Sequence, residues 1–364
     1  MTLEAIAGRL RLDPGRSPAV ACERPVVGAA LLGRLTRGRA AALVPDLLAS
    51  VFTLCADAQR GTSRRAVQAA LGRTGTACDA AGDAQRAALQ VAREHLQRLA
   101  LDLPARSATA APQPGWLREV PLHGLESAPQ QALPQAAAAL RAFLEEQLLG
   151  MPATAWLDAW RRGRGDWLAR WCRQQPHPVA RWLAAVQPDA EAAGWDCRAL
   201  HPDAPDAAAS IAAALERDAR FAASPIWQGA PAETGPWTRG GSPDPVFSAW
   251  DRLGARIADL SRIALGQPLA CGALTLAEGV GLAWTEMSRG LLMHWVQLEG
   301  ARQAETARVV RYHVLAPTEW NFHADGAFAQ WLAAGSATAA QARLAAAALD
   351  PCIEFSLDEA GHHA

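Results

Sequence analysis

The sequence predicts a mainly helical fold with a minor antiparallel sheet, and three observations support this prediction. Apolar residues recur at helical spacing over long stretches between residues 40 and 266. Two segments, 291–298 and 308–315, instead alternate polar and apolar residues around Glu299-Gly300, which is typical of paired antiparallel strands. Half of the residues are hydrophobic, which is enough for a sizeable buried core. We expect a single domain spanning residues 1–364.

The first expected element is a small hairpin, formed by residues 6–12 and 19–27 around the turn Asp13-Pro14-Gly15. A helix is expected from Ala40 to about Arg73 and another from 78 to 101, and the two would pair as long antiparallel helices. A loop rich in proline follows at 104–129. The remaining expected helices are 134–149, 152–172, 205–221, 246–266, 325–334 and 336–349.

Tryptophans are concentrated in the middle of the chain, in a helical region at about 104–223. Trp156, Trp160, Trp167 and Trp171 are spaced by four and seven residues, so they line one face of a helix. Such a face is more often packed into a core than presented as a binding surface. We therefore expect these indoles to be core residues.

Charge and hydropathy exclude several classes of protein. The 35 basic and 36 acidic residues are spread along the chain without a block of one sign, so nothing predicts binding to nucleic acid or to a lipid surface. The first twelve residues lack the apolar core of a secretory signal. The longest apolar stretch, 40–58, is interrupted by Pro45 and Asp46, whereas a membrane-spanning helix needs about 20 apolar residues. The sequence predicts a cytoplasmic protein without membrane insertion.

Familiar metal and nucleotide motifs are missing from the sequence. The seven cysteines include no CxxC pair, so neither a disulfide framework nor a zinc ribbon is predicted, and most cysteines are expected to be small buried hydrophobic residues. Gly279-x-Gly281 lies between strand-like segments and lacks the third glycine and the helix of a dinucleotide-binding loop. Nucleotide binding is therefore rejected.

Several separated segments resemble, in the same order, the large subunit of nickel-iron hydrogenases. Residues 350–352, Asp-Pro-Cys, resemble the start of that family's late Asp-Pro-Cys-x-x-Cys motif, whose thiolates bind the metals. Residues 51–59 lie where the family has its early Arg-Ile-Cys-Gly-x-Cys-x-x-x-His motif. Between them, Pro-Thr-Glu-Trp-Asn at 317–321 and Glu-Met-Ser-Arg-Gly-x-x-x-His at 286–294 resemble two further family segments. The resemblance implies a large-subunit-like fold built on long packed helices.

The departures from that family carry the functional argument. Phe52 replaces the first cysteine of the early motif and Phe355 the second cysteine of the late one, which leaves Cys55 and Cys352. Two thiolates cannot give nickel its all-sulfur site, because soft thiolate ligands are what select that metal, so nickel is not expected. Iron that already carries diatomic ligands needs few protein donors. In that family a maturation protease removes a C-terminal extension after a histidine or arginine that follows the last cysteine. Asp358 occupies that position here and six residues follow it, so no removable extension is expected.

This pattern is similar to the HupK/HoxV family of hydrogenase assembly proteins, which resemble the large subunit but have lost half of its cysteines. The resemblance implies a scaffold without turnover that carries the Fe(CN)2(CO) unit of the cofactor, transiently, toward the enzyme. The implied partners are a donor complex of HypC/HypD type and the precursor of a hydrogenase large subunit.

The same resemblance implies the residues of the site. Cys55 and Cys352 would hold the iron, either together or in turn. Arg289 matches an arginine that donates to a cyanide nitrogen, and Thr318 matches the position that contacts the other cyanide, because a buried anionic complex needs such donors. The ordinary alternatives are buried apolar thiols, a salt-bridged arginine and a loop threonine.

Three further residues are implied behind these ligands. Glu94 and His95 resemble an acid-histidine pair on the second long helix, and Asp350 is the aspartate before the late cysteine. Structural ion pairs are the alternative for all three. Glu286 is expected to order its own loop.

Two other functions stay open. One is a hydrogenase with a rearranged site that uses two thiolates and Arg289. The other is a metal-free chaperone that mimics the large subunit in order to occupy a maturation factor or the small subunit. Detectable nickel with hydrogen-dependent dye reduction would favour the enzyme, and complex formation that survives loss of both Cys55 and Cys352 would favour the chaperone.

Overall fold

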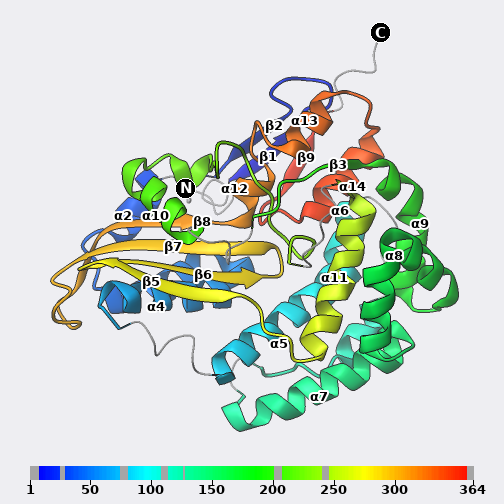
Figure 1. Ribbon diagram of the computed structural model, residues 1–364, viewed down its shortest axis with the longest axis horizontal. Coiled ribbons are helices and arrows are strands. Elements are labelled where there is room, and N and C mark those ends of the chain that lie inside the picture. The colour runs from blue at the N-terminus through cyan, green and yellow to red at the C-terminus, as the bar shows by residue number, and fades with distance from the viewer. Residues whose placement is uncertain are drawn as a thin grey trace.

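The structure is a computed structural model that describes residues 8–24, 29–73, 81–107, 114–125, 128–200, 207–239 and 246–358. The last six residues, on which the expectation about trimming depends, lie outside this part, as does the beginning of the chain. Figure 1 shows a four-stranded sheet with its covering helices on one side and a group of packed helices on the other. The predicted class, mainly helical with a minor antiparallel sheet, is confirmed.

The largest sheet has the strand order β5-β6-β7-β8 and is antiparallel throughout. Its strands are β5 (Cys271–Ala277), β6 (Val280–Met287), β7 (Gly290–Glu299) and β8 (Arg308–Leu315). The predicted pairing of β7 with β8 is confirmed, with Glu299 opposite Arg308. Strands β6 and β7 are buried along almost their whole length, so they show little of the alternation that marks a half-exposed strand.

The single helix expected from residue 40 to 73 is wrong, because the chain turns a corner there. Helix α3 (Val44–Val51) ends at Phe52, a short turn covers Thr53–Cys55, and α4 (Ala56–Ala70) leaves at 106°. Phe52 and Cys55 both have non-helical backbone angles. Among the described residues no single helix is long and apolar enough to cross a membrane, and α3 and α4 meet that test only when taken together across their bend.

The predicted pairing of the two long helices is also wrong. Helix α4 lies along β5, β6 and β7, where Gly281 gives room for its backbone. Helix α5 (Ala81–Gln97), which continues as a π-helix to Asp102, packs instead against α11 (Ala249–Ala264). The π-helix leads into α6 (Leu103–Arg106).

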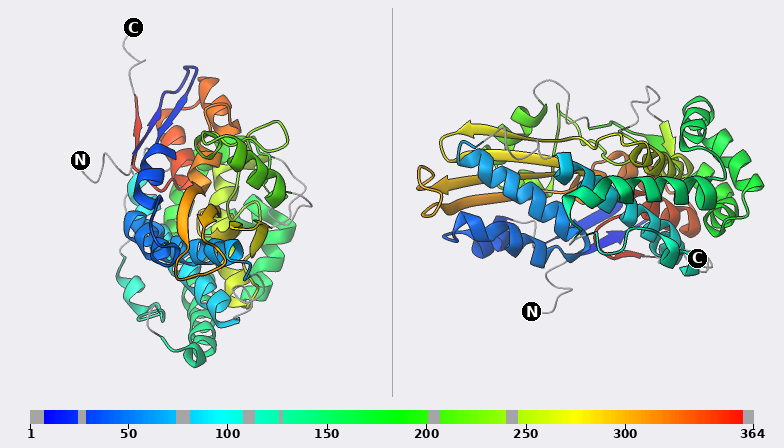
Figure 2. Two further views of the ribbon diagram at one scale, coloured as in Figure 1. Left: turned by 90° about the vertical axis from the view of Figure 1, so that its left-hand side faces the viewer. Right: turned by 90° about the horizontal axis from the view of Figure 1, so that it is seen from below.

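Nearly every residue of α11 is buried, because α11 is the centre of the helical half (Figures 1 and 2). Trp156, Trp160 and Trp171 are at most 1% exposed, which confirms their expected place in the core, whereas Trp167 is only partly buried against that core. The helices that pack against α11 are α5, α7 (Leu133–Phe143), α8 (Ala153–Gln174), α9 (Pro178–Ala192) and α14 (Ala339–Leu349). The other helices are α2 (Ala29–Thr36), α10 (Ala207–Arg217), α12 (Pro317–Asn321) and α13 (Ala327–Ala333).

Two small sheets complete the fold. The predicted hairpin of β1 (Arg9–Leu12) and β2 (Val20–Glu23) is confirmed, and β9 (Phe355–Leu357) joins β1 in parallel with Leu10 opposite Phe355. This pairing of distant segments anchors the chain directly after Cys352. A two-stranded sheet pairs β3 (Gly194–Asp196) with β4 (Val246–Ser248).

Candidate functional site

Cys55 and Cys352 meet, although 297 positions separate them in the chain. Cys55 lies at the corner between α3 and α4, and Cys352 follows α14 after Asp350, whose φ of 55° turns the chain out of the helix. Their sulfur atoms are close enough to share a hydrogen bond. Cys55 is buried and Cys352 partly exposed. The fold therefore places the two cysteines in one site.

The two thiols are electrostatically unequal. The hydrogen bond between them raises the pKa of Cys55, as does burial, and the same bond lowers the pKa of Cys352 well below its ordinary value. The charge of Arg289 also lowers the pKa of Cys352. The Thr318 hydroxyl acts in the same direction, and it also accepts a 3.2 Å hydrogen bond from the Cys352 backbone N–H. These interactions favour loss of the proton from Cys352 over loss of the proton from Cys55.

Arg289 is held beside this pair in the turn between β6 and β7. Its side chain is completely buried, and it lies 3.7 Å from a carboxylate oxygen of Glu94 and 3.6 Å from one of Asp350. Burial alone would lower its pKa, but the negative charges of Asp350, Cys352 and Glu94 raise it above its ordinary value. None of its three guanidinium nitrogens donates a hydrogen bond to any described residue. A buried cation whose nitrogens donate no hydrogen bond to the described residues thus acts electrostatically on both thiols.

Asp350 balances several cations at once. Its carboxylate lies 3.3 Å from Arg256, 3.6 Å from Arg98 and from Arg289, and 3.9 Å from Arg106, measured between nitrogen and oxygen. The carboxylate is fully buried. Asp350 is therefore a counter-ion shared by four arginines around the segment that carries Cys352.

Glu94 faces the site, whereas His95 does not. Glu94 accepts a hydrogen bond from Ser288, and burial raises the pKa of Glu94. His95 instead lies 2.8 Å from Asp259 on α11, in a buried network in which Arg239 bridges Asp259 to Glu286 at 2.5 and 2.7 Å. Of the adjacent pair, only Glu94 contacts Arg289.

Four residues near the thiols were not identified from the sequence. Gln59 donates a 3.7 Å hydrogen bond to the Cys55 sulfur from one turn along α4, at the position where the family has its histidine. Arg24 and Glu319 form a buried 2.6 Å ion pair whose charges act on Cys352 and on Cys22. The spacing of four residues could have identified Gln59. Arg24 and Cys22 reach the site only through the β2-β1-β9 sheet, which no local pattern predicts.

No model of a known protein family matches the chain. The hydrogenase expression/formation protein HoxV of Cupriavidus necator is 37% identical over 375 aligned positions, which cover 97% of this chain and 96% of that protein. The hydrogenase expression/formation protein HupK of Rhizobium leguminosarum bv. viciae is 31% identical, with 98% of each chain covered. The chain belongs to the HupK/HoxV family. The resemblance stated from the sequence motifs is thereby confirmed.

Solved hydrogenases share a looser likeness with this HupK/HoxV chain. The [NiFeSe]-hydrogenase of Dm. baculatum superposes with a TM-score of 0.49 at 12% identity, covering 91% of this chain and 92% of that chain. An NAD+-reducing [NiFe]-hydrogenase superposes with a TM-score of 0.46 at 14% identity, covering 87% and 88%.

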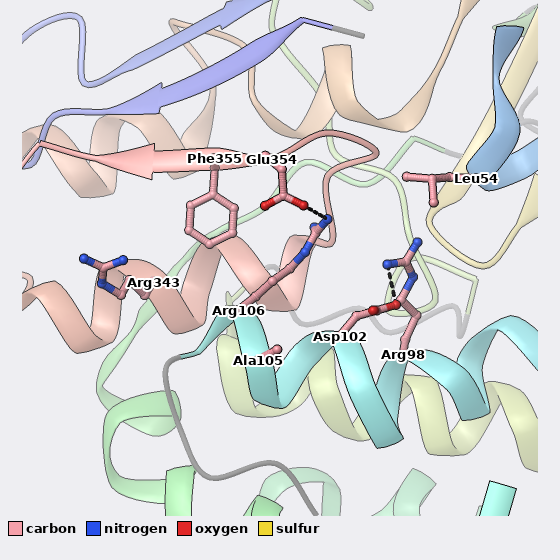
Figure 3. A pocket seen from close by; sticks show the side chains of 8 residues that line it. All are labelled: Leu54, Arg98, Asp102, Ala105, Arg106, Arg343, Glu354 and Phe355. Atoms are coloured by element: carbon pink, nitrogen blue, oxygen red, sulfur yellow. Dashed lines mark hydrogen bonds and ion pairs between the residues drawn. The ribbon is translucent and has the colours of Figure 1, made fainter. Parts of the chain in front are cut away.

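The two phenylalanines at the replaced cysteine positions of the HupK/HoxV chain lie in different surroundings. Phe52 is 7% exposed and packs in the same apolar core as Cys55. Phe355 is partly buried and lines a cleft of about 440 Å³ outside the thiols. Figure 3 shows this cleft between β9 on one side and the segment from Arg98 to Arg106 on the other. One replaced position is thus packed in the core beside Cys55, and the other lines a cleft whose lining includes neither cysteine.

Among the described residues, no group of three or more histidine, cysteine, aspartate or glutamate side chains is placed to hold a metal ion. The thiols of Cys55 and Cys352 are the soft donors of this site, and Arg289 supplies hydrogen-bond donors for an anion.

Proposed function

We propose that this protein takes part in hydrogenase maturation as a carrier of the Fe(CN)2(CO) unit, with the iron held by Cys55, Cys352 or both and without turnover. One observation supports the proposal above the others. The two thiols share a site with Arg289, a fully buried guanidinium whose nitrogens donate no hydrogen bond to the described residues. An unsatisfied buried donor is costly, so such a side chain is expected where an anionic ligand accepts its hydrogen bonds.

Each residue of the site would make a different contact with this iron complex. A cysteine donates to iron as a thiolate, and the lowered pKa of Cys352 favours its loss of a proton, whereas Cys55, with a raised pKa, would become a donor once it loses its own. Arg289 would donate to a cyanide nitrogen, a charge-assisted hydrogen bond to an anionic complex. The Thr318 hydroxyl is the donor proposed for the other cyanide. Glu94 and Asp350 keep the guanidinium in place, and His95 supports α5 against α11 from a separate network.

Two protein thiolates suit a complex that brings its own ligands. A bare nickel ion in a hydrogenase-type centre would draw on four thiolates, and the positions of two are taken by Phe52 and Phe355. The names of the curated relatives, hydrogenase expression/formation proteins, agree with a role in assembly. A HypC/HypD-type donor and a large-subunit precursor are the partners we propose.

Infrared spectroscopy tests the proposal directly. Protein purified without oxygen after co-expression with the maturation machinery should show cyanide and carbonyl stretching bands, and Cys55→Ala with Cys352→Ala should remove them. Cys172→Ala is the matched control, because Cys172 is a buried cysteine in the core around α8 and should leave the bands unchanged. Thiolate carriage would be refuted by bands that persist in the double variant. It would also be refuted if the wild type, co-expressed with the maturation machinery, showed no bands.

The other candidate functions are outcomes of the same preparation. Stable complexes with maturation proteins, formed equally well by the double cysteine variant and without bands, would indicate a metal-free chaperone. Bound nickel together with hydrogen-dependent dye reduction would indicate an enzyme.

A further inference from the structure

The turn that carries Arg289 extends beyond the strand next to it. Strands β6 and β7 form a tight hairpin in which Met287 is paired with Gly290, so Arg289 is in a two-residue turn. Strand β8 ends with Leu315 opposite Met293. Among the described strands, none therefore lies beside the first residues of β7 on that side. A buried backbone N–H at this end of β7 needs another acceptor.

Thr234 supplies this acceptor. Its hydroxyl oxygen accepts a 2.9 Å hydrogen bond from the Leu291 N–H, and Thr234 is completely buried. A Cβ on Gly290, whose φ is 130°, would lie 2.8 Å from the backbone of Thr234, so only glycine allows the two segments to come this close. The chain at Thr234 thus packs directly against the residue that follows Arg289.

Thr234 is held in turn by Asn321, the last residue of α12. The Asn321 side-chain oxygen accepts a 2.9 Å hydrogen bond from the Thr234 N–H, and its side-chain nitrogen donates a 2.9 Å hydrogen bond to the Thr234 carbonyl. The amide therefore satisfies both backbone groups of Thr234, as a neighbouring strand would. Thr318 is three residues earlier on the same short helix, and residues three apart share a helix face.

The segment that contains this threonine, residues 233–239, is anchored at both ends. At its start, Glu233 forms a 2.7 Å ion pair with Arg252 of α11, and both side chains are buried. At its end, Arg239 donates a hydrogen bond to the Met287 carbonyl, on the strand before the turn. The segment therefore contacts the hairpin both before and after the turn and connects it to the central helix.

We infer that Thr234 and Asn321 are positioning residues, which fix Arg289 and Thr318 relative to one another. Under the proposed function, on which this role rests, those two side chains contact the two cyanides of one rigid complex. Donors for such a ligand have to be held within about 0.5 Å, and a helix of one turn has little stability of its own. The bonds between Thr234 and Asn321 connect the helix that carries one donor to the turn that carries the other.

The first test needs no iron and uses the full-length, reduced protein. Amide hydrogen exchange is measured by mass spectrometry on peptides that cover residues 288–292. Thr234→Val keeps the shape of the side chain but removes the acceptor, so the Leu291 N–H should exchange about 3- to 10-fold faster, the effect of losing one hydrogen bond. Asn321→Leu should act in the same direction, although the hydrogen bonds of Asn321 go to Thr234. Thr234→Ser keeps the hydroxyl and should exchange like the wild type.

The second test uses protein loaded by co-expression with the maturation machinery. A donor that moves relative to a cyanide changes the cyanide stretching frequency, whereas a general loss of stability only lowers the amount of loaded protein. Thr234→Val should therefore shift the cyanide bands, and Thr234→Ser should keep them at the wild-type positions.

Thr36→Val is the matched control for both tests. Thr36 is completely buried, and its hydroxyl donates a 2.8 Å hydrogen bond to the Leu32 carbonyl within α2. The same change of side chain should therefore leave the exchange of residues 288–292 and the cyanide frequencies unchanged. Thr234→Ala removes the same acceptor with less bulk, and it replaces Thr234→Val if that variant does not fold.

The inference is overturned if exchange at Leu291 is the same in Thr234→Val, Thr36→Val and the wild type, or if the cyanide bands of loaded Thr234→Val superpose on those of the wild type. If the wild type shows no bands while exchange at Leu291 becomes faster in Thr234→Val, the carrier function fails and the connection between the turn and α12 stands. Wild-type bands that depend on both cysteines, with neither change in Thr234→Val, would mean that the carrier function stands and the positioning role fails.

Discussion

Replacing Asp350 with asparagine removes one negative charge and almost no volume. Asparagine also tolerates the left-handed backbone at this position, where φ is 55°. Arg98 and Arg106 retain other partners in Asp102 and Glu354, so the loss falls mainly on Arg256 and Arg289, whose side chains are completely buried. Removing one partner of a buried ion pair costs about 3–5 kcal/mol, because the remaining charge stays in a medium of low dielectric constant.

The free energy of unfolding of Asp350→Asn should therefore be about 3 kcal/mol or more below that of the wild type. Urea unfolding followed by tryptophan fluorescence measures this difference. Glu354→Gln removes a 3.6 Å ion pair of Arg106 with a 90% exposed carboxylate, and it should cost less than about 1 kcal/mol. If Asp350→Asn and Glu354→Gln lose the same small amount, Asp350 is not the counter-ion that holds these arginines.

Three further predictions follow from the described contacts. Gly281→Ala places a Cβ 2.4 Å from the backbone of α4, a clash that no side-chain movement can relieve. The free energy of unfolding should therefore fall by about 2 kcal/mol. Gly33→Ala is the control, because it has open space around it and should not destabilise the protein. Burial lowers the pKa of His294 from 6.5 to about 3, so its contribution to stability is full above pH 6.5 and is lost as the pH falls toward 3. His294→Gln should therefore reduce the loss in the free energy of unfolding between neutral pH and pH 5 by about 2 kcal/mol. An unchanged pH dependence would contradict this. Because the Cys55 hydrogen bond and the Thr318 hydroxyl lower the pKa of Cys352, Thr318→Val should move the midpoint of its alkylation by iodoacetamide to higher pH, and a profile that superposes on the wild type would be inconsistent with that role.

The sequence predicted the β7–β8 pair and most of the helices, because each depends on local periodicity, but it did not predict α2 or α9. It failed at Phe52, where apolar spacing continues through the corner since α3 and α4 both pack on the same core. Local periodicity also could not join β9 to β1, whose pairing connects opposite ends of the chain.

The site residues were found through motifs rather than through spacing, and their mutual placement needed the structure. Glu94 and His95 illustrate the limit. Successive residues of an α-helix point about 100° apart, so an adjacent pair cannot both face one site. The helix directs Glu94 toward Arg289 and His95 toward Asp259 on α11. Arg24 and Glu319, which are 295 positions apart, had no shared motif to connect them.

The two lost cysteines matter differently for a carrier. Phe52 fills its position with a buried ring in the core beside Cys55, so the site loses a donor without gaining access. Phe355 instead lines the cleft of Figure 3, so the second donor is lost from a position outside that core. Under the proposed function, fewer thiolate bonds have to break at hand-over. A resident metal centre needs a full set of ligands, whereas transient cargo needs only a few donors. The replacements of both cysteines therefore fit carriage better than catalysis.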